Sequence, residues 1–143
     1  MGGWRMRLMW EPDFAEAHSN LAFALGRKGF FDEAIVQYQE AVGLNPNSAE
    51  IRYNLGNALV RRSRLDEAIV QFYEVIRLRP DHVDAHNNLG VALTGMGRLD
   101  EAIGQFQEVL RLAPDNAEAR KNLMIAIRRK GALEKRSFDL KGP

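Results

Sequence analysis

The sequence predicts an all-α fold built from stacked pairs of helices, and two kinds of periodicity indicate it. Prolines recur every 34 residues, at Pro12, Pro46, Pro80 and Pro114. Asparagines keep the same spacing, at Asn20, Asn54, Asn88 and Asn122. Within each period, apolar residues return at steps of three and four, which is typical of helices with one buried face.

The segment Ala49–His82 shows the repeating unit most clearly. Its first half reads AEIRYNLGNALVRRSR and its second half reads LDEAIVQFYEVIRLRP. The apolar face of the first half consists of Ile51, Leu55, Ala58 and Leu59. The apolar face of the second half consists of Leu65, Ala68, Ile69, Phe72, Val75 and Ile76. Each period therefore predicts two amphipathic helices.

The pattern of this unit resembles that of the tetratricopeptide repeat (TPR) family. Members of that family have Leu-Gly, then Ala, an aromatic residue and Pro within 34 residues. The middle repeat has these residues at Leu55, Gly56, Ala68, Phe72 and Pro80. The next repeat has Leu89, Gly90, Ala102, Phe106 and Pro114, and the first has Leu21, Ala22, Ala34, Tyr38 and Pro46. The resemblance implies a right-handed α-solenoid of antiparallel helix pairs.

The pattern is closest to the superhelical TPR arrays of O-linked N-acetylglucosamine transferases. Those arrays repeat the run Ala-His-Ser-Asn-Leu-Ala, which this sequence has at Ala17–Ala22.

The period also predicts the boundaries of the repeats. We expect a partial upstream helix or N-terminal cap, three repeats, a capping helix and a tail, at 1–14, 15–48, 49–82, 83–116, 117–136 and 137–143. The capping helix is indicated by Met124, which replaces the glycine that lets paired helices approach closely. We expect Arg128, Arg129 and Lys130 to face water there.

Short local signals agree with these boundaries. Acidic pairs such as Asp66-Glu67 and Asp100-Glu101 open the second helices, where we expect them to cap the helix ends. Ser63 stands at the turn where other repeats have glycine, and would cost about 1 kcal/mol if that turn needs a positive φ.

Composition limits the class of protein. The chain has 143 residues, of which 45% are hydrophobic, and no cysteine, so disulfides and thiolate metal sites are excluded. The sequence has no run long and apolar enough for a membrane span and no signal-peptide pattern at its start. We therefore expect a cytoplasmic protein that does not interact with membranes.

The net charge of +1 is unevenly distributed, because bases outnumber acids only after residue 116. The basic end lacks the interleaved aromatic residues that stack on single-stranded bases. A solvated terminal helix is therefore a better interpretation than a nucleic-acid site.

We find no set of residues with the arrangement that catalysis needs, and we expect no enzyme activity, cofactor or metal. His82 and His86 have the spacing of metal ligands on a helix, but two ligands are too few for zinc. A structural role accounts for them better: His82 stands at a helix entry, and His86 stands where helices pack against each other.

The family resemblance implies that the first helices line a concave groove that holds a partner's peptide. The groove residues would be Asn20, Phe23, Arg27, Tyr53, Asn54, Asn57, Arg61, Asn87, Asn88, Val91, Lys121 and Asn122.

Some TPR proteins hold a chaperone's C-terminal carboxylate with a clamp of lysine, asparagine and arginine. The corresponding positions here are Ser19, Phe23, Asn54, Asp84 and Asn88, or one repeat later Tyr53, Asn57, Asn88, Glu118 and Asn122. The asparagines are present but every cation is missing, so we reject the clamp.

The asparagine ladder allows two interpretations. An amide can bind the C=O and N–H of a peptide ligand together. Alternatively, each asparagine bonds to the next helix and tightens the stack. Polar neighbours such as Asn57 favour the first interpretation, in which the asparagines bind a peptide.

The sequence therefore predicts a non-enzymatic protein interaction scaffold that binds an extended polypeptide. Two alternatives are a self-assembling structural protein and the substrate-presenting arm of a larger glycosyltransferase. We also expect self-association through residues 1–11, because Trp4, Met6, Leu8, Met9 and Trp10 form a large apolar surface.

Overall fold

The structure is a computed structural model that describes the backbone of residues 3–143 and the side chains of residues 14–143. Within this part of the chain it has seven helices and no strand, so the predicted all-α fold is confirmed. The chain divides into two compact units, Met1–Pro80 (unit 1) and Asp81–Pro143 (unit 2).

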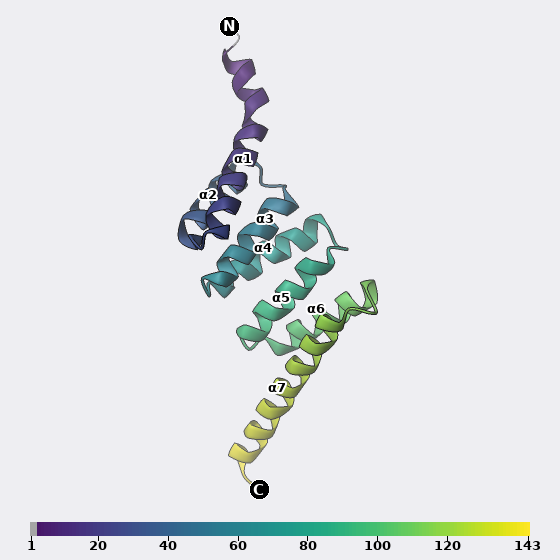
Figure 1. The fold of residues 1–143 in the computed structure, drawn as a ribbon. Helices are drawn as coiled ribbons and strands as arrows, with labels where there is room; N and C mark the ends of the chain where they lie inside the picture. Colours follow the sequence, from purple (N-terminus) through teal and green to yellow (C-terminus); the bar gives the residue numbers. More distant parts are fainter. Residues whose placement is uncertain (1–2) are drawn as a thin grey trace. The chain divides into compact units, whose positions relative to one another are not determined.

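Unit 1 contains two helix pairs, which Figure 1 shows in purple to teal. The first pair is α1 (Gly3–Arg27) with α2 (Phe31–Leu44), and the second is α3 (Ala49–Arg61) with α4 (Leu65–Leu78). The helices of each pair pack together, and α3 also packs against α2.

Unit 2 contains one helix pair and a long final helix. The pair is α5 (Val83–Gly95) with α6 (Leu99–Leu112), and α7 (Ala117–Lys141) packs mainly against α6.

Side chains cap the helices that open the later repeats. Ser48 Oγ accepts a hydrogen bond from the backbone N–H of Ile51 at 3.2 Å. His82 Nδ1 and Asn116 Oδ1 accept the equivalent bonds, from Ala85 and Ala119, at 3.0 and 2.9 Å. Each bond satisfies one of the N–H groups that a helix start leaves without an internal partner. His82 therefore has the helix-entry position predicted from the sequence.

The acidic pairs that open the second helices lie in their first turns, as predicted. The residues at the helix starts, Arg64 for α4 and Arg98 for α6, make no side-chain cap hydrogen bond. Instead, Arg64 donates two hydrogen bonds to the Glu67 carboxylate at 2.8 and 2.7 Å. The glutamate still lies in the first turn, where its charge is favourable to the helix dipole.

The turn inside each repeat uses one residue with a left-handed backbone. Gly29 and Gly97 have φ values of 87° and 74°, and Ser63 takes the same region at 57°. A side chain is unfavourable in this region because Cβ approaches the following carbonyl oxygen. The turn therefore needs a positive φ at Ser63, which is the condition under which we predicted strain there.

A glycine in the first helix of a repeat lets the pair approach closely. A Cβ added to Gly56 would lie 2.6 Å from the Phe72 ring, and one added to Gly90 would lie 2.5 Å from the Phe106 ring. Both rings are fully buried. Tyr73, the residue after Phe72, is 38% exposed, because it falls one residue outside the buried face.

A polar contact also recurs within each repeat, between residues 19 apart. His18 Nδ1 and Gln37 Oε1 lie 2.7 Å apart, and His86 and Gln105 repeat this pair at the same distance. Arg52 replaces the histidine in the middle repeat and donates to Gln71 at 2.9 Å.

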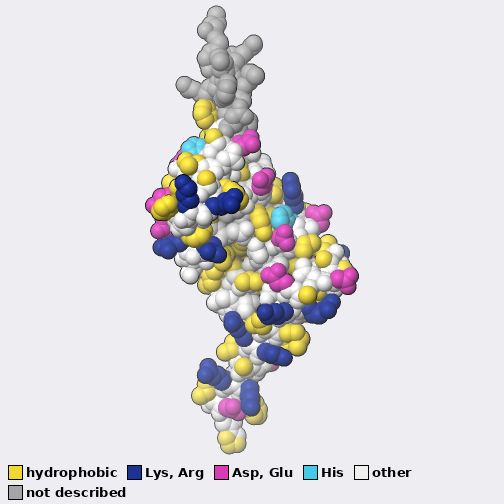
Figure 2. Space-filling model, in the orientation of Figure 1, with side chains coloured by type: hydrophobic (Ala, Val, Ile, Leu, Met, Phe, Trp, Pro, Cys, Tyr) yellow, Lys and Arg dark blue, Asp and Glu magenta, His cyan; other side chains and the backbone are white. Residues whose placement is uncertain are grey.

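The helix α7 fits the predicted terminal cap. Met124, at the position of the packing glycines, is 48% exposed. The helix extends to Lys141, beyond the predicted boundary at residue 136. Gly131 takes no left-handed conformation, and the following residues are mostly good helix formers, so nothing ends the helix earlier. Figure 2 shows basic and apolar side chains together on this exposed end.

The start of α1 lies upstream of the predicted repeat boundary at Ala15. The predicted self-association surface, residues 1–11, lies outside the side chains that the structure describes.

Candidate functional site

Unit 1 has a cavity of about 320 Å³ between its first helices. Its walls come from α1, the start and middle of α2, and α3. The lining residues are Phe23, Gly26, Arg27, Phe31, Tyr38, Asn54, Asn57, Ala58 and Arg61.

Helical spacing explains why these side chains converge. Asn54, Asn57 and Arg61 follow each other at steps of three and four on α3, so they share one face. Phe23 and Arg27 have the same relation on α1. Phe23 is 54% exposed, which leaves a large aromatic surface available at the cavity.

Phe31 and Tyr38 line this cavity from α2. The guanidinium carbon of Arg61 lies 5.0 Å from the centre of the Phe31 ring, a cation–π distance. Tyr38 is buried beneath, and burial raises the pKa of its hydroxyl, which therefore stays protonated at neutral pH.

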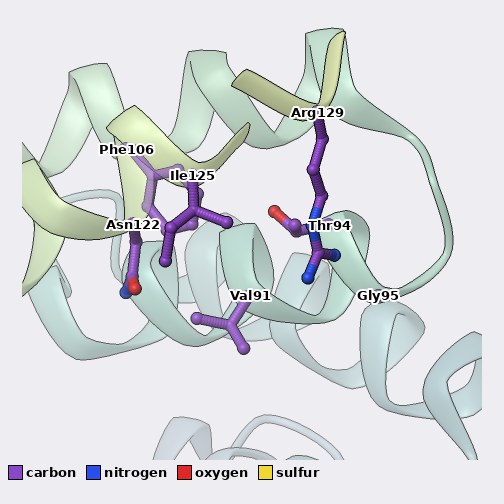
Figure 3. A pocket seen from close by; sticks show the side chains of 7 residues that line it. All are labelled: Val91, Thr94, Gly95, Phe106, Asn122, Ile125 and Arg129. Carbon is purple, nitrogen blue, oxygen red and sulfur yellow. The ribbon is translucent and has the colours of Figure 1, made fainter. Parts of the chain in front are cut away.

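Unit 2 has a cavity of about 280 Å³ at the same position in the repeat. Its lining residues are Val91, Thr94, Gly95, Phe106, Asn122, Ile125 and Arg129. Each of these stands two periods after a lining residue of unit 1. Figure 3 shows Arg129 pointing from α7 toward Thr94, with Ile125, Phe106 and Asn122 beside it and Val91 opposite.

A second cavity of unit 2, about 520 Å³, adjoins the first. Both cavities are lined by Thr94, Gly95 and Arg129, and the second continues along α7 to Leu133 and Arg136. The exposed end of α7 thus extends the same surface.

The asparagine ladder has different roles at different positions. Asn54 lines the unit 1 cavity and makes no side-chain hydrogen bond to residues 14–143. Asn122 lines the unit 2 cavity and donates to Asn87 Oδ1 at 3.3 Å. Asn87 in turn donates to Glu118 at 3.2 Å. The bond from Asn122 to Asn87 ties α7 to α5, as the structural interpretation of the ladder expects.

The structure brings seven of the predicted groove residues to the two equivalent cavities. They are Phe23, Arg27, Asn54, Asn57 and Arg61 in unit 1, and Val91 and Asn122 in unit 2.

The other five predicted residues do not line these cavities. Asn20 and Lys121 are exposed, and Asn88 is half-buried. Tyr53 is half-buried, with its ring centre 6.2 Å from that of Phe72. Asn87 is only 6% exposed, because its amide faces α7 instead of an open groove.

The second helices supply cavity walls that the sequence did not predict, namely Phe31, Tyr38 and Phe106. Arg128 and Arg129 are exposed, as predicted, and Lys130 is half-buried. Arg129 lines both unit 2 cavities, and Lys130 Nζ lies 2.7 Å from Asp100 Oδ1. The period contained the signal, since Arg129 stands two repeats after Arg61 and Lys130 two repeats after Arg62, which pairs with Asp32 at 2.8 Å.

Two other features bear on chemistry. No group of three or more His, Asp or Glu side chains among the described residues could hold a metal ion. His86, one of the two candidate ligands, lies against Gln105 instead. Among the described residues, no helix is both long and apolar enough to cross a membrane.

Comparisons with known proteins agree with the repeat geometry. Two family models, both described as tetratricopeptide repeat, match residues 19–82 and 59–127. This chain is a tetratricopeptide repeat protein. No curated protein matches it significantly.

Several solved structures share the fold. The first TPR of Spaghetti (RPAP3), bound to the HSP90 peptide SRMEEVD, has a TM-score of 0.79 at 23% identity, covering 83% of this chain and 94% of that one. MamA has a TM-score of 0.80 at 26% identity, covering 96% and 87%. YrrB, described as a TPR protein with an unusual peptide-binding site, has a TM-score of 0.71 at 29% identity, covering 75% and 55%.

The family models and the solved structures support the TPR repeats. The closer resemblance to the arrays of O-linked N-acetylglucosamine transferases stays a prediction.

Proposed function

We propose that this TPR protein is a non-enzymatic interaction scaffold that binds an extended polypeptide along the face formed by its first helices. One observation carries the proposal: a cavity with the same register and a similar volume occurs in both units. Core packing alone requires no such opening, and each opening exposes a large apolar residue, Phe23 or Val91.

The chemistry of the cavities suits a peptide. Each combines apolar walls with an amide, Asn54 or Asn122, that can exchange hydrogen bonds with a ligand backbone. Apolar pockets with a few polar groups are the usual form of binding sites. Peptide ligands of the similar structures, such as SRMEEVD on the first TPR of Spaghetti, point the same way.

The ligand differs from a chaperone C-terminus in this proposal. The positions at which a carboxylate clamp has cations hold Ser19, Asp84 and Asn88. Recognition therefore depends on the cavities and not on the clamp.

Three further expectations are part of the proposal. The repeats run over 15–48, 49–82 and 83–116, with caps outside them. Residues 1–11 mediate self-association, and the protein works in the cytoplasm.

The test uses short peptides selected from a random library on the full chain. Asn54→Ala should weaken the binding of the selected peptides about tenfold, which corresponds to about 1.4 kcal/mol of binding free energy. The melting temperature should stay nearly unchanged, because Asn54 has no side-chain partner among the described residues.

Asn87→Ala is the matched structural control, since it removes the partner of Asn122 and Glu118. It should lower the free energy of unfolding by about 1 kcal/mol. If Asn54→Ala destabilises the fold but leaves peptide affinity intact, the groove proposal is wrong.

A further inference from the structure

The unit 1 cavity contains two cations and no acid. Arg27 and Arg61 both line it, and no Asp or Glu is among the lining residues. Within residues 14–143, neither arginine forms an ion pair with a carboxylate. The cavity therefore carries positive charge that the described protein does not neutralise.

The donors of Arg61 are available to a ligand. Its guanidinium lies at a cation–π distance from Phe31. No side-chain hydrogen bond or ion pair joins its N–H groups to residues 14–143. A guanidinium matches a carboxylate, which can accept two parallel N–H bonds.

Helix polarity does not explain this arrangement. Arg27 and Arg61 are the last residues of α1 and α3, where cations are favourable to the helix dipole. Three other arginines near helix ends are paired with acids: Arg62 with Asp32, Arg77 with Glu74 and Arg111 with Glu108. The dipole accounts for a cation at each end, but not for two unpaired cations that line one cavity.

The equivalent cavity of unit 2 has a different character. Gly95 replaces Arg27, Ile125 replaces Asn57, and Arg129 is the one cation of its lining. Leu99 stands where Phe31 supports Arg61, so Arg129 has no ring beneath it at that position.

We propose that the unit 1 cavity binds an acidic residue of an extended partner segment, with its Asp or Glu carboxylate between Arg27 and Arg61 and an apolar neighbour against Phe23. Asn54 supplies an amide donor beside the carboxylate. This inference rests on the proposed function and adds the chemistry of the ligand. Its two cations, Arg27 and Arg61, stand at positions other than those of the rejected clamp.

The test starts from peptides selected on the full chain from a random library without bias in charge. Their affinities are measured by fluorescence anisotropy for the native chain and for the double variant Arg27→Gln with Arg61→Gln. The control, Lys28→Gln with Arg79→Gln, removes the same charge from unit 1 outside the cavity. Circular dichroism checks that every variant folds.

We expect the selected peptides to share an Asp or Glu. The cavity variant should bind them at least about tenfold more weakly, and the control variant less than about threefold more weakly. Replacing the shared acid of the peptide by Gln or Asn should cause the same loss of affinity for the native chain. It should cause no further loss of affinity for the cavity variant.

The inference and the proposed function fail in different ways. If the selected peptides lack a shared acid, or keep their affinity for the cavity variant but lose it with Asn54→Ala, the acidic ligand is wrong and groove binding stands. If no peptide is selected, or if the peptides bind all these variants equally, both are wrong.

Discussion

The cavities of the two units differ in chemistry although their backbones repeat. Unit 1 presents Phe23, Arg27 and Asn57 where unit 2 presents Val91, Gly95 and Ile125. The residues that set the helix spacing are nearly unchanged, because Gly56 meets Phe72 in one unit as Gly90 meets Phe106 in the other. The fold thus restricts a few buried positions and leaves the exposed cavity wall free to vary.

The glycine contact gives the largest predicted effect on stability. Gly56→Ala and Gly90→Ala should each lower the free energy of unfolding by about 1–3 kcal/mol, because the new Cβ overlaps a fully buried ring. Urea denaturation measures the loss. Similar losses in the two units would show that both depend on the same close approach.

Glycines in open space provide the controls. A Cβ added to Gly43 in α2 or Gly104 in α6 meets nothing within 4 Å, so alanine there should stabilise the helix by up to about 1 kcal/mol. If Gly56→Ala is as well tolerated as Gly43→Ala, the ring does not restrict the helix spacing.

The turn residue gives a smaller effect that distinguishes the units. Ser63 has a positive φ in unit 1, whereas Gly97 fills the same position in unit 2. Ser63→Gly should stabilise the protein by about 1 kcal/mol, and Gly97→Ser should destabilise it by a similar amount. Thermal melts of both variants and of the combined exchange would test this; a loss from Ser63→Gly would show that the Ser63 side chain stabilises the turn.

The smallest effect concerns pH. Hydrogen bonds from Arg64 lower the pKa of Glu67 in unit 1, and those from Arg111 lower the pKa of Glu108 in unit 2. A lowered folded-state pKa means that the stabilisation is complete above the unfolded pKa and is lost as pH falls through the folded one. Both pairs are exposed, so the loss should be slight.

Melting curves from neutral to about pH 3 would measure this loss. Glu67→Gln with Glu108→Gln should make the curve flatter in that range. An unchanged acid dependence would assign it to other carboxylates.

The sequence predicted the helix pairs because they depend on local patterns. Apolar spacing, the Leu-Gly pair and the caps at Ser48 and Asn116 act within a few residues of themselves. The family resemblance also named seven residues that line the two cavities, since position in the repeat determines which way a first helix presents them.

The remaining differences depend on partners that a period does not identify. Asn87 is buried because Glu118 and Asn122 are its particular neighbours, whereas Ser19 occupies its position in the first repeat. Phe31 and Tyr38 line a cavity because they lie at the border between core and groove. The end of α7 was underestimated because no packing pattern continues past Gly131, although helix-forming residues do.

The recurring contact between residues 19 apart has a consequence for folding kinetics. His18 meets Gln37, Arg52 meets Gln71 and His86 meets Gln105, so each pair of helices is joined across one short turn. Closing such a short loop costs little chain entropy, and proteins rich in local contacts fold quickly. A helix pair can therefore nucleate the structure without waiting for distant parts of the chain to meet, so folding can begin in either unit.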